Sequence, residues 1–478
     1  MFVRISAKST RPNAIANTTY RRSLSSAGKR EGYKSIGSFH SDNVEELIGI
    51  PTDLYRPPSL PFDAVPPPSD FPVPLESDFM LQRPEWTFLN HGAFGASLRC
   101  GYDRAQQWRL HLERQPLRFF DRDLLPHLVH SARQMAEFVN ADRSGIALLP
   151  NVTTGINTAI AGYVREHRNP QILLWDVSYG SVKTIARAYC DRVVEIPLQS
   201  SYFTDSWDED VFMEALEDQM AKHDDWTGTL FIIDHTTSNT ALNFPIERLA
   251  KRAKEAGMLT LLDGAHGLLA QKIDFDRLPS VDIYISNGHK WLSCPRGVAF
   301  LYCPHEELRE TILRKPAVIS HGYDDGYLSR FIWDGTRDYA AQLALPVVLD
   351  FWTRADPALM RTWMHMKLTD AVQVIAQSWY PMFAKDVDDW QGEVTLGSME
   401  MHSAMALVRL PPRLCGSSLN PKTSTDAKRI QDYLYDNKIE VPIKCINEVL
   451  YVRVSCHIYN ELEEYDRLAQ VMLDFPAK

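Results

Sequence analysis

Lys290 and Asp263 are the two residues whose type and position most directly indicate chemistry. Lys290 follows the apolar run VDIYISNGH, and Asp263 ends the apolar run LTLLD. An amine at the end of a buried strand loses solvation, which lowers its pKa and makes it nucleophilic. A buried carboxylate can hold a pyridine nitrogen protonated, so that the ring withdraws electrons as pyridoxal phosphate (PLP) chemistry requires. The structural alternatives are a surface lysine that caps a loop and an aspartate in a turn.

The elements that would position these residues alternate between strands and helices. Apolar runs predict strands at 171–177, 229–235, 259–266, 281–291 and 297–303. A helix followed by a strand is expected within 181–196, and IERLAKRAKEAGM predicts an amphipathic helix over 246–258 that closes at a glycine. This order indicates an α/β fold with a mainly parallel sheet covered by helices. Ligands of such sheets gather at the carboxyl ends of the strands, where His235, Asp263 and Lys290 fall.

The 478 residues divide into four predicted parts. These are a transit peptide or disordered tail (1–32), a proline-rich arm (33–84), a large domain (85–345) and a small α+β domain (346–478). Proline fixes φ and removes a hydrogen-bond donor, so residues 51–74 are expected to be extended, and the folded body is expected to begin near Trp86. In the last part, strands are expected at 405–411 and 448–455 and a helix around 423–437.

Composition disfavours several classes of protein. The formal net charge of -10 argues against a nucleic-acid partner held by bulk charge, and no apolar run reaches the ~18–20 residues of a membrane span. Seven scattered cysteines without a CxxC pair indicate no disulfide framework and favour a reducing compartment. No HExxH or zinc-finger spacing predicts a metal site, and no G-x-G-x-x-G follows a strand. Residues 1–30 are basic and free of acidic residues, so we expect mitochondrial targeting, with plastid or cytoplasmic location as alternatives.

Several motifs in matching order resemble the class V aminotransferase family between roughly residues 86 and 470. They are NHGAFGA (90–96), NVTTGIN (151–157), DHTTSN (234–239), LLDGAH (261–266), SNGHKW (286–291), WDGTRD (333–338) and YVRVSCHIYN (451–460). The resemblance is closest to the branch of isopenicillin N epimerase, plant L-cysteine desulfhydrase and fungal hercynylcysteine sulfoxide lyase. It implies the aminotransferase-like fold: a large PLP-binding domain on a mainly parallel seven-stranded sheet covered by helices, and a smaller α+β C-terminal domain.

The resemblance also implies roles at the cofactor. Lys290 matches the Schiff-base lysine that shuttles protons. Asp263 matches the partner of the pyridine nitrogen, and His266 matches the residue that supports the ring face or the phenolic oxygen. The other matched positions contact the phosphate (Thr153, the Thr154 backbone, Asn287 and His289), stack on the ring (Tyr179) or reach the phenolic oxygen (Ser238). Gly335 and Thr336 match a segment that in relatives reaches the phosphate of the neighbouring subunit, which implies a homodimer with shared sites.

Arg453 is the expected clamp for the α-carboxylate of an amino-acid substrate. A guanidinium offers two parallel donors to a carboxylate, and strand alternation puts Arg453 on one face with Tyr451 and Ser455. Alternation alone leaves open a solvent-facing arginine, and the family match favours the clamp. Three more residues are expected on the substrate side, with structural alternatives of a turn or a scaffold contact: Asn90, His91 and Arg337.

The expected reaction is α,β-elimination at sulfur from L-cysteine or a cysteine derivative. The tracts SNGHKWLSCPRGVAFLYC, GTRDYAAQL and LPPRLCG (410–416) look more like the desulfhydrase and sulfoxide-lyase relatives than the bacterial epimerase. Amino-acid epimerisation is the alternative. Cysteine desulfuration would need a reactive thiolate, for which Cys415 is the candidate, although an unreactive thiol is the favoured interpretation there. A catalytically silent PLP-fold protein also stays open.

Overall fold

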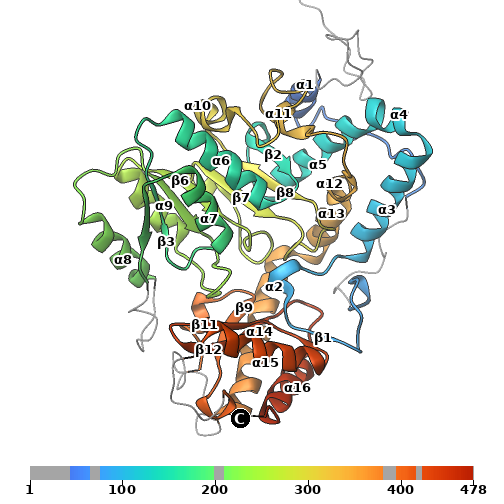
Figure 1. Cartoon of the computed structure of the whole chain (residues 1–478). Coiled ribbons are helices and arrows are strands. Elements are labelled where there is room, and N and C mark those ends of the chain that lie inside the picture. Colours follow the sequence, from blue (N-terminus) through green and yellow to red (C-terminus); the bar gives the residue numbers. More distant parts are fainter. Residues whose placement is uncertain (1–42, 65–75, 199–208, 381–393, 416–421, 477–478) are drawn as a thin grey trace, which may run out of the picture.

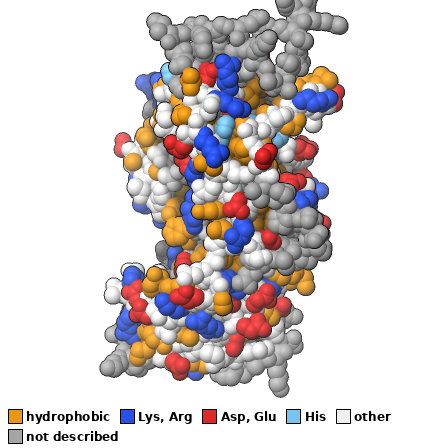
Figure 2. Space-filling model, turned by 90° about the vertical axis from the view of Figure 1, so that its right-hand side faces the viewer, with side chains coloured by type: hydrophobic (Ala, Val, Ile, Leu, Met, Phe, Trp, Pro, Cys, Tyr) orange, Lys and Arg blue, Asp and Glu red, His pale blue; other side chains and the backbone are white. Residues whose placement is uncertain are grey.

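The structure, a computed structural model, describes residues 43–64, 76–198, 209–380, 394–415 and 422–476 (Figure 1). The expected transit peptide or tail, residues 1–32, lies outside these ranges, as does part of the proline-rich arm. Figure 2 shows basic and acidic side chains interspersed on the face that carries α3 (Arg99–Arg114). None of the described helices combines the length and the apolar character needed to cross a bilayer.

A seven-stranded sheet forms the centre of the larger part of the molecule (Figure 1). Its strands are β2 (Ile146–Leu149), β3 (Ile172–Trp175), β4 (Val193–Ile196), β5 (Leu230–Asp234), β6 (Leu259–Asp263), β7 (Ile283–Asn287) and β8 (Ala299–Tyr302). They lie in the order β2-β8-β7-β6-β5-β3-β4, and only β8 runs against its neighbours. The prediction of a mainly parallel seven-stranded sheet is therefore confirmed. Every residue of β2, β3, β5, β7 and β8 is buried, as expected where helices cover both faces of a sheet.

Some helices pack on this sheet, and others pack on one another beside it. α6 (Val152–Glu166) contacts β6, β7 and β8, whereas α9 (Ile246–Glu255) contacts β5 and β6. Gly155 permits the close approach of α6, because a Cβ there would lie 2.8 Å from Leu149 and 2.9 Å from Ile285. α3, α5 (Leu124–Phe138), α12 (Ala340–Leu343) and α13 (Leu345–Ala355) pack on one another beside the sheet (Figure 1). The remaining helices of this part are α2 (His91–Phe94), α4 (Pro116–Arg118), α7 (Gly180–Tyr189), α8 (Asp210–Met220), α10 (Glu306–Glu310) and α11 (Tyr327–Ile332).

A second hydrophobic core lies in the C-terminal part of the chain. The antiparallel sheet β11-β12-β9 packs there with three helices. These elements are β9 (Met405–Arg409), β11 (Ile443–Ile446), β12 (Val449–Ser455), α14 (Pro357–Trp379), α15 (Ser424–Asp436) and α16 (Leu462–Leu473). The division at residue 345 stays a prediction. However, β1 (Thr87–Phe88) pairs with β10 (Ile439–Glu440), and Leu89 packs in the C-terminal core, so residues 87–89 associate with the small part, although Phe88 also packs against the main core.

The expectation that the folded body begins near Trp86 is wrong. The short helix α1 (Val44–Gly49) packs against α5, with Val44 0% and Ile48 3% exposed. Glu45 fixes it by accepting hydrogen bonds from the backbone N–H and the hydroxyl of Ser329 at 2.9 and 3.1 Å. The spacing of Val44 and Ile48 puts two apolar side chains on one face of a helical turn, and this face is buried as part of the main core.

Candidate active site

A cavity of about 190 Å³ opens at the carboxyl ends of β5, β6 and β7, beside the first turns of α6 and α7. This is the edge at which a parallel sheet collects ligands. Eight of the predicted site residues line it: Thr153, Tyr179, Ser238, Asp263, His266, Asn287, His289 and Lys290. The structure thus brings together residues separated by as many as 137 positions, from Thr153 to Lys290.

Lys290 lies at the floor of the cavity. Burial lowers its pKa to about 8, although the charge of Asp263 acts in the opposite direction. Its Nζ lies 3.1 Å from Nε2 of His266. Burial and the nearby Lys290 charge hold the pKa of His266 well below its usual range, so the imidazole is neutral and can accept a hydrogen bond from the amine. The site therefore contains an amine that is partly uncharged near neutral pH.

Asp263 is accompanied by a second carboxylate that the sequence reading did not single out. Asp234 ends β5 directly beside Asp263 in the register of β5 and β6, and it also lines the cavity. Burial raises the pKa of both groups, and the Asp263 charge raises that of Asp234 further, to about 7. Asp234 accepts a hydrogen bond from the Ser178 hydroxyl at 2.6 Å, and Asp263 accepts one from the Ala265 N–H at 2.9 Å. The signal for Asp234 was available, because both apolar runs end in aspartate.

The first turn of α6 forms one wall of the cavity. Asn151 precedes the helix and accepts a hydrogen bond from the Thr154 N–H at 2.9 Å. Asn287 accepts one from the Val152 N–H at 3.1 Å, which ties the end of β7 to the start of α6. The resemblance assigns the Thr154 N–H to a phosphate cradle. In the structure this N–H donates to the side chain of Asn151, which is the N-cap of α6. Thr153, which does line the cavity, stands at the positive end of the helix dipole.

The predicted substrate-side histidine, His91, contacts the backbone of Lys290 instead of lining the cavity. Its Nε2 lies 2.9 Å from the carbonyl oxygen of Lys290, and its Nδ1 lies 2.8 Å from the hydroxyl of Tyr459. A carbonyl only accepts, so Nε2 carries the proton and Nδ1 accepts from Tyr459. His457 stacks on His91 with ring centroids 4.1 Å apart, and its Nε2 lies 3.1 Å from the carbonyl oxygen of Trp291.

Gly95, like His91 and His457, packs against the backbone of the loop that carries Lys290. Its φ is +67°, and a Cβ at this position would lie 1.8 Å from the carbonyl oxygen of His289. Only glycine fits such a backbone conformation at this distance. The segment 90–96 therefore lies directly against the backbone of His289 and Lys290.

Arg453 is 3% exposed and joins the C-terminal sheet to the rim of the cavity. It donates to the carbonyl oxygen of Ser238 and, at 3.2 Å, to Oδ1 of Asn90. Burial lowers its pKa to about 10, so the guanidinium remains charged at neutral pH. The predicted residue Asn90 therefore orients Arg453 and does not itself line the cavity.

Three buried nitrogen atoms around the site have no hydrogen-bond partner among the described residues: Nδ1 of His266, Nδ1 of His289 and Nε of Arg453. Buried polar atoms are normally satisfied, so such a group of unpaired nitrogens at one cavity indicates a polar ligand. The cavity offers a group for each part of PLP. The amine suits the aldehyde, and the carboxylate pair suits the pyridine nitrogen. The helix N-terminus suits the phosphate, and the aromatic ring suits the ring of the cofactor. The residues present therefore fit this cofactor.

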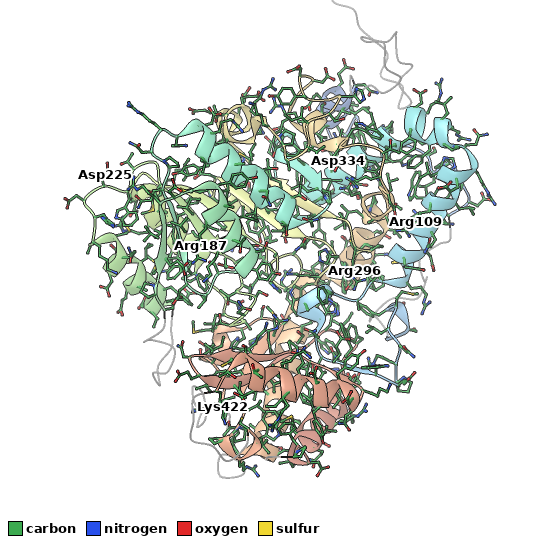
Figure 3. The ribbon with its side chains drawn as sticks, viewed as in Figure 1. Arg109, Arg187, Asp225, Arg296, Asp334 and Lys422 are labelled. Carbon is green, nitrogen blue, oxygen red and sulfur yellow. The ribbon has the colours of Figure 1, made fainter. Side chains whose placement is uncertain are left out.

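Three predicted residues do not reach the cavity of their own chain. Arg337 binds Asp334 at 2.5 Å and lies 3.9 Å above the Tyr339 ring, so its assignment to substrate binding is not supported. Figure 3 places Asp334 on the side of the molecule that carries Arg109. Gly335 has φ +115°, a Cβ at this position would meet no other atom within 4 Å, and Thr336 is exposed. Their contact with a neighbouring subunit stays a prediction.

Comparisons with known proteins agree with this geometry. The family model described as aminotransferase class-V matches residues 126–406. A protein named probable L-cysteine desulfhydrase, chloroplastic, from Arabidopsis thaliana is 29% identical over 82% of this chain and 84% of its own length. Isopenicillin N epimerase of Streptomyces clavuligerus is 28% identical over 82% of this chain and 96% of its own. A solved structure of the cystine C-S lyase C-DES with its product cysteine persulfide is 20% identical, covers 82% of this chain and 98% of its own, and has a TM-score of 0.64.

Proposed function

Since this chain belongs to the class V aminotransferase family, we propose that it is a lyase that cleaves the carbon–sulfur bond of L-cysteine or a cysteine derivative by α,β-elimination. The cofactor is pyridoxal phosphate. The observation that carries the proposal is the buried amine of Lys290, whose pKa is about 8 and whose Nζ lies 3.1 Å from a neutral imidazole. The names of the relatives support sulfur chemistry in preference to other outcomes.

The floor of the cavity would hold the cofactor. Lys290 would bind its aldehyde carbon, Asp263 its pyridine nitrogen, and the first turn of α6 with Thr153 its phosphate. When bound, PLP supplies an electron-withdrawing ring that stabilises the negative charge left on the α-carbon of an amino acid after proton removal. The pKa of Asp234 is raised to about 7, so this carboxyl would be protonated in part of the molecules near neutral pH and would then add no second negative charge beside Asp263.

The residues of the chain would orient the substrate and move its proton. Arg453 offers two donors to the α-carboxylate and keeps its charge at neutral pH. Lys290, uncharged in part of the molecules, would accept the α-proton at Nζ, and His266 would hold the amine in place through Nε2. Cleavage of the bond between the β-carbon and sulfur then releases sulfide, a thiol or a sulfenate, which carries away the electron pair. The three-carbon remainder hydrolyses to pyruvate and ammonia.

A persulfide mechanism is less well supported by the structure. Burial raises the pKa of Cys415 to about 11, so its thiol is protonated at neutral pH. Cys415 also does not line the cavity. Epimerisation is the second candidate, because a relative that matches 82% of this chain bears that name.

We also propose a homodimer in the mitochondrion. Large apolar side chains stand exposed at the cavity and at the hollow beside it, including Phe94 (65% exposed), Tyr179 (48%) and Ile319 (56%). A second copy of the chain would cover them. Light scattering should give twice the mass of the chain, and a monomer at micromolar concentration would contradict this. A fluorescent fusion of residues 1–32 should enter mitochondria, and cytoplasmic fluorescence would contradict the location.

The reaction can be tested with a panel of amino acids that includes L-cysteine, S-substituted cysteines and L-alanine. Pyruvate, sulfide or thiol, and loss of optical activity are measured together. We expect pyruvate and the sulfur product in equal amounts. Loss of optical activity without pyruvate would support epimerisation and refute the proposed lysis.

A further inference from the structure

A second cation lies on the same sheet face as Arg453. Strand alternation puts Tyr451 and Arg453 on one face of β12. Lys444 of β11 stands directly opposite Tyr451 in the antiparallel register, and opposite residues share a face. Lys444 and Arg453 are therefore diagonal neighbours on one face of the three-stranded sheet. This face meets the large part of the molecule, because Arg453 and Ser455 both contact it.

The two cations contact consecutive residues of one turn at the cavity rim. Arg453 donates to the carbonyl oxygen of Ser238, which lines the cavity, and Lys444 Nζ lies 3.4 Å from Oδ1 of Asn239. The charge of Lys444 also acts on a residue inside the cavity, because it contributes to the lowered pKa of His266. Lys444 thus stands beside the expected place of a substrate carboxylate, further along the rim.

Neither cation has a carboxylate partner in the described part of the chain. No Asp or Glu of those residues forms an ion pair within 4.0 Å of Arg453 or of Lys444. Burial and, to a smaller extent, the Arg453 charge lower the pKa of Lys444 to about 8. Arg453 is buried and Lys444 is partly buried, so the two neighbouring positive charges repel one another unless a negative ligand neutralises them. One α-carboxylate would engage Arg453, which would leave Lys444 for a second negative group.

We propose that Lys444 selects substrates with a second anionic group on the side chain, namely cysteine S-conjugates whose sulfur substituent ends in a carboxylate. The assignment rests on the proposed function, since it takes Arg453 as the clamp of the α-carboxylate. It narrows that function from cysteine derivatives in general to acidic S-conjugates. A hydrogen-bonded ion pair at a partly buried rim favours the charged ligand over a neutral analogue of the same shape.

Two nearly isosteric ligands test this selectivity. S-carboxymethyl-L-cysteine carries the second carboxylate, and S-carbamoylmethyl-L-cysteine replaces it with a neutral amide. Stopped-flow tryptophan fluorescence gives the Kd of the wild-type holoenzyme for each ligand in the first milliseconds, before turnover. Trp291, next to Lys290 and 1% exposed, is a suitable reporter. We expect the carboxylate to bind about tenfold more tightly than the amide.

Variants assign the preference to Lys444. Lys444→Gln should abolish it while the Kd of the amide changes less than about twofold, and Lys444→Arg should retain it. Lys428→Gln is the matched control, because Lys428 belongs to the same part of the chain with a side chain 66% exposed, and it should keep the wild-type ratio. If Lys444→Gln fails to fold, Lys444→Met takes its place. Equal Kd values in the wild type, or a preference that survives in Lys444→Gln, would overturn the proposal.

The same measurements separate this inference from the proposed reaction. A carboxylate preference that depends on Lys444, without any release of pyruvate, would refute lysis and leave the selectivity standing. Release of pyruvate from both ligands, with equal Kd values, would support lysis and refute the selectivity.

Discussion

The floor and the cap of the cavity are built in different ways. The floor consists of strand ends and helix starts within residues 126–406, and its polar groups are Asp234, Asp263, His266 and Lys290. The cap comes from segments on either side of that range: Asn90 and His91 before it, and Lys444, Arg453 and His457 after it. The floor fits the needs of the cofactor. In the cap, Lys444 and Arg453 are suited to hold and select the substrate, whereas His91 and His457 hold the backbone of the floor at Lys290 and Trp291. Substitutions of the two cations should therefore change substrate choice more than cofactor binding.

Removal of the floor amine should have the largest effect. Lys290→Ala removes the amine that we propose binds the cofactor aldehyde and accepts the α-proton, so pyruvate formation should fall by about 10³-fold or more. Borohydride reduction followed by mass spectrometry should show a cofactor adduct on the wild type and none on the variant. Lys428→Ala, at an exposed position, is the control. An adduct of full yield on Lys290→Ala would refute the assignment.

The two floor carboxylates should respond differently to the same substitution. Asp263→Asn removes the charge expected at the pyridine nitrogen and should lower kcat by about 100-fold. Asp234→Asn resembles the protonated form that the raised pKa of Asp234 favours, so its kcat should fall by less than about tenfold. The absorbance spectrum of the bound cofactor should shift in the first variant only. Similar losses in both would mean that the pair acts as one unit.

Removal of a cap cation should change KM more than kcat. Arg453→Gln deletes the expected clamp, so KM for the amino acid should rise by about 100-fold while the cofactor remains bound. Arg429→Gln, on the outer helix α15, should behave as the wild type. If cofactor binding were lost together with substrate binding, the separation of floor and cap would be wrong.

The histidine pair of the cap predicts a pH-dependent stability. Burial lowers the pKa of His457 to about 4 from an ordinary value near 6.5, so the unfolded chain binds a proton between these values and the folded chain does not. Stability is therefore lost as pH falls below 6.5, by about 2 kcal/mol between pH 7 and pH 5 for this group. Urea unfolding should show a smaller pH dependence in His457→Phe, and an unchanged slope would contradict the prediction.

The smallest effect is expected at Cys415. Its protonated thiol lies away from the cavity, so Cys415→Ala should keep sulfide release within about twofold of the wild type. Sulfide release is measured with and without an added reductant. A loss of more than tenfold would restore the persulfide route.

The sequence predicts the floor better than the cap. Runs such as LFIID and LTLLD show both the strand and the polar residue at its end, because the two are neighbours in the chain. The four-residue strand β2 was missed because IALL is short and has no alternation, and an apolar run of this length does not distinguish a strand from part of a buried helix. The contacts of His91 and Arg453 join residues 199 and 363 positions apart, and no local pattern reveals such pairs. The hydrogen bond from the Thr154 N–H to Asn151 was not predicted, because the motif NVTTGIN is compatible with an N-cap and with an anion cradle.

The support of the Lys290 loop has a consequence for the synthesis of the protein. Domains generally fold as they emerge, the N-terminal part first. The sheet and its two aspartates precede the C-terminal part in the chain, whereas His457 belongs to that later part. A nascent molecule would hold the Lys290 amine on an incompletely anchored loop. The geometry of the cavity would therefore be complete only after the C-terminal part has folded onto the large one.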